Sequence, residues 1–91
     1  MITAIVLIEA ERDVFATLGS ELVEIEGVAE AYSVTGEWDF VAIVRVPRHE
    51  LLSEVVSGTI GVLPGVVGTQ TMVAFEAFSK HDLDALFDIG N

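Results

Sequence analysis

The chain has 91 residues, with 15 acidic side chains against four basic ones and a formal net charge of −11 at pH 7. This length suits one domain, and the charge repels nucleic-acid phosphates, so we expect no direct binding to DNA or RNA. The chain has no cysteine, which excludes disulfides and thiolate metal sites. No apolar run reaches the ~20 residues of a membrane span. We therefore expect a cytoplasmic protein with no membrane partner.

The first half of the chain predicts a strand, a helix and a second strand. Residues 3–8 (T-A-I-V-L-I) form the short apolar, largely β-branched run that is typical of a strand. A helix should follow, with Asp13 as its N-cap and Gly27 beyond its end. The apolar face of this helix consists of Val14, Leu18, Leu22 and Ile25.

The second half repeats this pattern 38 residues later. The run at residues 40–46 (F-V-A-I-V-R-V) answers the first strand, and Gly27 maps onto Gly65 without a gap. The second helix should end before the pair Pro64-Gly65, which cannot continue a helix. Its start shows no convincing capping residue. Its apolar residues are Leu52, Val55, Val56, Ile60 and Leu63. We interpret the two halves as a structural duplication.

Two strand-helix-strand units with right-handed crossovers place both helices on one face of a four-stranded sheet. The predicted fold class is α+β, a ferredoxin-like βαββαβ sandwich. The strands are apolar on both faces, as Val41 and Ile43 opposite Ala42 and Val44 illustrate, so the second face needs a cover. We expect a second copy of the chain, giving a dimeric α/β-barrel-like assembly. A short C-terminal helix with Leu83, Leu86 and Phe87 is a smaller, partial alternative.

Nothing in the sequence predicts a catalytic residue, a metal site or a cofactor. His49 and His81 stand in polar surroundings without a recognisable motif, and the spacing of His81, Asp82 and Asp84 suits a metal poorly. No glycine-rich phosphate loop is present.

The turn at residues 35–39 (T-G-E-W-D) is the most unusual segment. Gly36 tolerates the positive φ that a tight hairpin needs, and Asp39 can hydrogen-bond the amides of the turn. Trp38 is a large aromatic side chain on a tight loop, and its burial there favours a contact with a neighbouring subunit or ligand. We interpret Trp38 as an anchor at an oligomer contact.

The order V-x-x-A-Y-x-V-T-G-E-W-D, an apolar strand and L-P-G-V-x-x-T-x-T resembles the effector-binding RAM domain of the Lrp/AsnC (feast/famine) transcriptional regulators. The resemblance runs from Ile2 to Phe75. Its hallmark G-x-x-D turn is matched by Gly36 and Asp39, and the T-x-T at the start of the last strand falls in residues 69–71. Full regulators carry an N-terminal helix-turn-helix domain, whereas this sequence begins with the first RAM strand at Ile2, so we expect the stand-alone form.

The resemblance implies a RAM-like domain over residues 1–78 and leaves an acidic tail, residues 79–91, without a role. It further implies dimers that pair through their sheets, a possible ring of dimers, and an amino-acid effector bound between dimers. The ligand-binding residues that it implies are Thr35, Gly36, Trp38, Asp39, Thr69, Gln70 and Thr71.

We therefore predict a non-enzymatic module that senses a small molecule, an amino acid, and that oligomerises as part of transcriptional regulation. It would act on DNA by co-assembly with a relative that binds DNA. The main alternative is a small dimeric ferredoxin-like enzyme of the monooxygenase or isomerase type, and a third is a scaffold with a vestigial pocket. Few charged or polar residues stand inside the predicted strands, among them Glu30, Ser33 and Arg45, which does not favour an enzyme.

Overall fold

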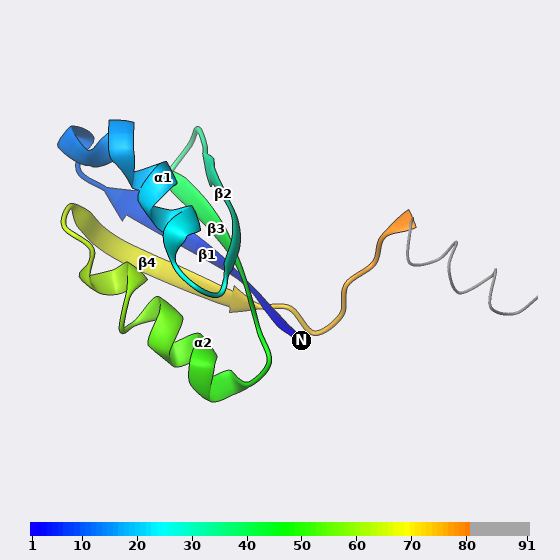
Figure 1. Ribbon diagram of the computed structural model, residues 1–91. Helices are drawn as coiled ribbons and strands as arrows, with labels where there is room; N and C mark the ends of the chain where they lie inside the picture. The colour runs from blue at the N-terminus through cyan, green and yellow to red at the C-terminus, as the bar shows by residue number, and fades with distance from the viewer. Residues whose placement is uncertain (81–91) are drawn as a thin grey trace, which may run out of the picture.

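The computed structural model describes residues 1–80 and contains one four-stranded sheet covered by two helices (Figure 1). The elements, in order, are β1 (Ile2–Ala10), the 3₁₀ helix η1 (Arg12–Val14), α1 (Phe15–Glu24), β2 (Val28–Ser33), β3 (Phe40–Val46), α2 (His49–Val56), the 3₁₀ helix η2 (Ile60–Val62) and β4 (Val66–Val73). The strand order is β2-β3-β1-β4, and all neighbours are antiparallel. This arrangement confirms the predicted ferredoxin-like βαββαβ sandwich.

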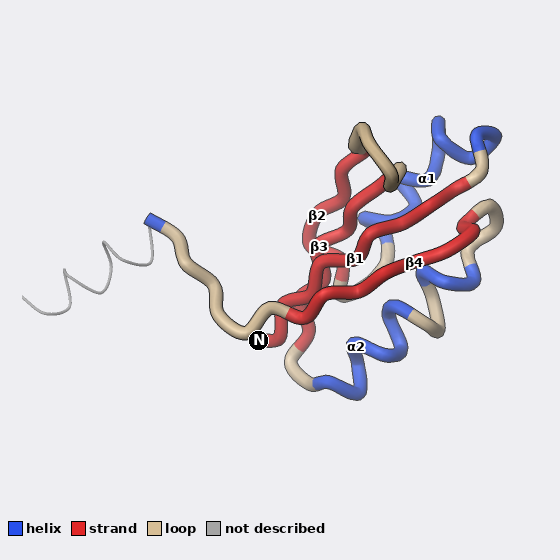
Figure 2. Tube along the Cα trace, turned by 180° about the vertical axis from the view of Figure 1, so that it is seen from behind, coloured by secondary structure: helices blue, strands red, loops and turns tan. Residues whose placement is uncertain are grey.

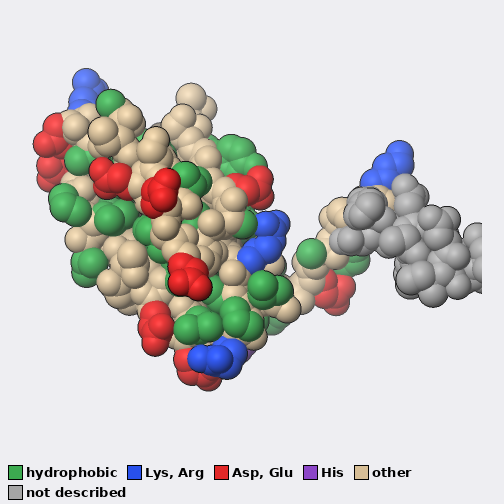
Figure 3. Space-filling view, in the orientation of Figure 1, with side chains coloured by type: hydrophobic (Ala, Val, Ile, Leu, Met, Phe, Trp, Pro, Cys, Tyr) green, Lys and Arg blue, Asp and Glu red, His purple; other side chains and the backbone are tan. Residues whose placement is uncertain are grey.

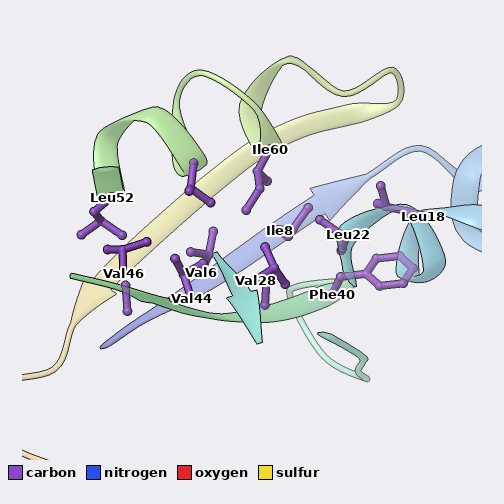
Figure 4. Packing of buried hydrophobic residues seen from close by; sticks show 13 residues of the cluster. Val6, Ile8, Leu18, Leu22, Val28, Phe40, Val44, Val46, Leu52 and Ile60 are labelled. Carbon is purple, nitrogen blue, oxygen red and sulfur yellow. The ribbon is translucent and has the colours of Figure 1, made fainter. Parts of the chain in front are cut away.

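The core lies between the sheet and the two helices, and its fully buried side chains are all apolar in the described part of the chain. Alternate residues of β1 and β3 point toward the helices, where they meet Leu22 and Ile60 (Figure 4). The ring of Phe40 packs edge-on against Phe15, with centroids 5.7 Å apart. The buried residues are Ala4, Val6, Ile8, Leu18, Leu22, Val28, Phe40, Ala42, Val44, Val46, Leu52, Val55 and Ile60.

Among the described residues, no helix lies on the opposite face of the sheet, as Figure 2 shows from behind. We call it the open face. The register pairs Leu7 with Val41 and Ile5 with Ile43, so these four side chains stand together there. Each is only half-buried in the single chain. The apolar residues of β1 and β3 that do not face the core therefore lie on the open face.

The two halves of the chain repeat the same local structure 38 residues apart. Gly27 and Gly65 both take positive φ, 99° and 89°, in the turn that leads into β2 or β4. The backbone bond from Ile25 N to Leu22 O measures 3.2 Å, and its counterpart from Leu63 N to Ile60 O also measures 3.2 Å. The predicted duplication is therefore visible in matching hydrogen bonds.

The helices depart from the predicted boundaries. Asp13 is not an N-cap, because it lies within η1 and α1 begins two residues later without a side-chain cap bond. The second helix is shorter than predicted and ends at Val56. After α2 the backbone of Gly58 comes so close to Glu54 that a Cβ there would lie 2.6 Å from the Glu54 carbonyl oxygen, so this turn requires glycine. The chain then continues as η2. As predicted, α2 begins without a side-chain cap.

Two predictions lie outside the described residues. These are the C-terminal helix with Leu83, Leu86 and Phe87, and the poorly spaced set His81, Asp82 and Asp84. The boundary at residue 78 also stays a prediction. Within the described part, β4 ends at Val73, and residues 74–80 lead away from the sheet (Figure 1).

Candidate functional site

The turn between β2 and β3 is tied to the end of β1 by Asp39. The carboxylate Oδ2 of Asp39 accepts a hydrogen bond from Ala10 N at 2.8 Å, in a partly buried position. Its own backbone N donates to Ile8 O at 2.9 Å, and its carbonyl accepts from Val34 N at 3.0 Å. Asp39 was expected to bond the amides of its own turn, but its side chain instead holds a strand 29 residues earlier in the chain.

The rest of this turn is open to a ligand. Gly36 has φ 112°, and a Cβ built there would meet nothing within 4 Å. Thr35 is exposed, whereas Trp38 is half-buried within the single chain. The positive φ predicted for Gly36 is therefore confirmed, and part of the burial of Trp38 comes from its own domain.

The three site residues on β4 pair with residues 6–8 of β1, and Thr69 is the nearest of them to the turn. Thr69 pairs with Ile8, Gln70 with Leu7 and Thr71 with Val6. Since cross-strand partners share a face, Gln70 stands on the open face, while the two threonines stand on the helix-covered face. All three are exposed because β4 is an edge strand.

The fold thus brings the turn and Thr69 to one end of the sheet, on either side of β1, while Thr71 lies beside the middle of β1 and Gln70 faces the other side of the sheet. Ile8 accepts the backbone bond of Asp39 on one side and pairs with Thr69 on the other. With strands spaced ~4.8 Å apart, the turn and β4 are about 10 Å from each other, a span that one amino acid can bridge. We call this arrangement the turn end of the sheet.

A polar network on the open face was not predicted. Tyr32 donates a hydrogen bond to Glu30 Oε2, and Arg45 NH1 lies 3.8 Å from Glu30 Oε1. The hydrogen bond to Glu30 raises the pKa of Tyr32 above its usual value, and the carboxylate charge adds to this effect. The spacing of Glu30 and Tyr32 in β2 indicated a shared face, but only the register of β3 brings Arg45 beside them.

The described residues form a second feature that sequence reasoning missed, a cavity of about 400 Å³ at the opposite end of the sheet. We call it the end cavity. It lies where α2 meets the start of β2 and the end of β3. Its lining residues are Met1, Glu26, Gly27, Arg45, Val46, Pro47, Leu51, Glu54 and Val55.

Among residues 1–80, no group of three or more His, Asp or Glu side chains is placed to hold a metal ion. His49 is exposed at the first position of α2. No helix in the same part of the chain is long and apolar enough to cross a membrane. Acidic side chains are scattered over the helix-covered face, with few basic ones among them (Figure 3).

Comparison with known proteins gives a consistent result. Residues 3–83 match the family described as the Lrp/AsnC ligand binding domain. The HTH-type transcriptional regulator FL11 of Pyrococcus abyssi is 36% identical over 77 residues, which cover 85% of this chain and 50% of that protein. The chain spans about half the length of the curated relatives that it matches first.

Solved structures share the fold of this chain. The crystal structure of TTHA0845 from Thermus thermophilus has a TM-score of 0.81 and 45% identity, and the match covers 88% of this chain and all of that one. The feast or famine regulatory protein Rv3291c of M. tuberculosis, complexed with L-methionine, has a TM-score of 0.71 and 26% identity. That match covers 88% of this chain and 54% of the mycobacterial one.

Proposed function

Because the chain belongs to the Lrp/AsnC ligand-binding domain family, we propose that it is a non-enzymatic sensor that binds a free amino acid at the turn end of its sheet. The observation that carries this proposal is the convergence of Asp39 and Thr69 on the last residues of β1. The L-methionine complex of the mycobacterial relative supports an amino acid as the class of ligand.

The chemistry of the turn end suits a zwitterion. Asp39 uses Oδ2 to hold Ala10, and its Oδ1 has no hydrogen-bond partner within the described residues, so it can accept a bond from an ammonium group. The hydroxyl groups of Thr69 and Thr71 and the open backbone around Gly36 offer neutral donors for the ligand's carboxylate. Thr35 and Trp38 complete the proposed site on the turn, and Gln70 would border it from the open face.

We further propose that a second copy covers the open face, in the dimer predicted from the sequence. The half-buried side chains of Leu7, Val41 and Ile43 form a continuous apolar patch with the exposed Met72. Contiguous apolar surface of this kind marks association sites in proteins. Dimers would then join into a ring and act in the cytoplasm by co-assembling with a DNA-binding relative, consistent with relatives that are named transcriptional regulators.

The composition of the interior supports the absence of catalysis. A small enzyme on this fold needs acid-base or cofactor-binding groups inside a cleft. In the part of the chain that the structure describes, no polar or charged side chain is buried.

The decisive test is a thermal-shift panel of the twenty amino acids, run at fixed protein concentration beside light scattering. At least one amino acid should raise Tm, by mass action on the folded state. Its N-acetyl and its carboxamide derivatives should each fail to do so, because each removes one charge that the turn end recognises. No shift with any amino acid, or equal shifts with the blocked derivatives, would overturn the proposal.

A further inference from the structure

The chain leaves the sheet after β4 with two large aromatic side chains exposed. Ala74 N still donates to Thr3 O at 2.9 Å, which keeps the start of this segment beside β1. Beyond that bond, residues 74–80 run outward from the domain (Figures 1 and 2). Phe75 is fully exposed and Phe78 is 80% exposed. We call this segment the arm.

The end cavity has a volume and a lining that suit such side chains. Its volume of about 400 Å³ is comparable with the ~300–1,000 Å³ of pockets that enclose small ligands. Val46, Leu51 and Val55 supply apolar wall, and Pro47 adds to it. An aromatic ring gains most from burial against surfaces of this kind.

The arm and the end cavity also lie at the same end of the domain. The arm begins beside Thr3, and the neighbouring residue Ile2 pairs with Val46 in the cavity wall. The arm nevertheless runs away from the cavity of its own chain. A second copy could place its arm in this cavity and offer its own cavity to this arm. Two copies related by a two-fold axis would make this contact twice.

Charge is consistent with this pairing. Glu76 lies between the two phenylalanines of the arm. Arg45 lines the cavity, its side chain is 47% exposed, and its contact with Glu30 is long at 3.8 Å. Arg45 can therefore offer Glu76 an ion pair at the cavity mouth, which offsets part of the repulsion from Glu26 and Glu54.

We propose that the arm of one copy docks into the end cavity of a second copy through Phe75 and Phe78. This contact adds to the sheet-face association proposed above and does not depend on amino-acid binding. Each copy would thus hold the other through its arm.

The absence of native cysteine makes a crosslinking test clean. One variant carries Phe78→Cys and a second carries Leu51→Cys in the cavity wall. Mixed under a glutathione redox buffer, they should form a disulfide between residues 78 and 51, identified by mass spectrometry of the linked peptides. The matched control replaces Leu51→Cys by Val62→Cys, whose site on η2 is 69% exposed and outside the cavity.

We expect the 78–51 link to exceed the 78–62 link by on the order of tenfold or more, because the docked arm, still held by Phe75, keeps residue 78 beside residue 51 and away from residue 62. Equal yields would overturn the proposal, since the more exposed control would then react equally well by collision. A chain carrying both Phe78→Cys and Leu51→Cys that closes only on itself would overturn the role of the second copy.

A second measurement does not require cysteine. The double variant Phe75→Ser/Phe78→Ser should weaken self-association in sedimentation by at least ~100-fold, whereas Val23→Ser, at a 47% exposed apolar position on α1, should not. Unchanged association of the double variant would contradict the arm contact. Failure of the sheet-face contact is recognised separately, because Ile43→Asp would then leave association intact while the 78–51 link still forms.

Discussion

Replacement of Asp39 separates its structural role from its proposed binding role. In Asp39→Ala, Ala10 N loses its only side-chain acceptor in a partly buried position, which costs about 1–3 kcal/mol of the free energy of unfolding. For a domain of this size that is a fall of roughly 4–20 °C in Tm. Asp39→Asn keeps an oxygen acceptor for Ala10 and exchanges a charge-assisted bond for a neutral one, so its cost should be only about 1 kcal/mol.

Asp39→Asn, which should cost little stability, should weaken ligand binding strongly. If the ammonium of an amino acid binds the carboxylate of Asp39, then Asp39→Asn weakens binding by roughly 1.5–3 kcal/mol, or about 10- to 150-fold in Kd. The matched control is Glu37→Gln, which removes the same charge from an exposed position two residues earlier in the turn. Glu37→Gln should change Kd by less than about threefold, since an exposed charge is largely screened.

Both quantities come from one experiment, thermal melting with and without the best amino acid, supported by isothermal titration at fixed protein concentration. The reasoning fails if Asp39→Asn keeps the full ligand-induced shift in Tm. It fails equally if Glu37→Gln loses as much affinity, because the effect would then reflect net charge and not the carboxylate at the turn end.

Three further outcomes follow from the structure. Gly65→Ala should lower the free energy of unfolding in urea by about 2–4 kcal/mol, because φ is 89° and the new Cβ would lie 2.4 Å from Val14 Cγ1. Gly36→Ala should lower it by only about 1–2 kcal/mol, because no atom lies within 4 Å of the new Cβ. Equal costs would contradict this steric account. Ile43→Asp should dissociate the proposed dimer in sedimentation, since an unpaired charge buried in an apolar interface costs several kcal/mol; a dimer that survives would exclude the open face. Finally, the purified protein should give no gel shift with duplex DNA at ~0.2 M salt, and a persistent bound band would contradict the charge argument.

The sheet was predictable because its information is local. The apolar run Phe40–Val46 was predicted with its observed bounds, since β-branched residues and flanking polar residues define a strand without reference to the rest of the chain. The helices were harder. Asp13 has the right chemistry for a cap, but the chain first forms the 3₁₀ turn η1, and the break near Gly58 depends on one close backbone approach.

The candidate site was predictable only in part, for the same reason. The motif indicated Gly36, and its positive φ is intrinsic to the turn. The bond from Ala10 to Asp39 and the end cavity join segments far apart in sequence, so no local pattern reveals them. The network of Tyr32, Glu30 and Arg45 likewise requires the register between β2 and β3.

The bond between Ala74 and Thr3 also bears on how the chain could be reconnected. It places the exit of β4 beside the entry of β1, while the turn around Gly36 sits in open space at the other end of the sheet. The chain could therefore be opened at the turn between β2 and β3 if the end of β4 were joined to the start of β1. A circular permutant that begins at β3 and joins β4 to β1 through a short linker would keep all three strand pairs and both crossovers, and it would fold with the two repeats in exchanged order.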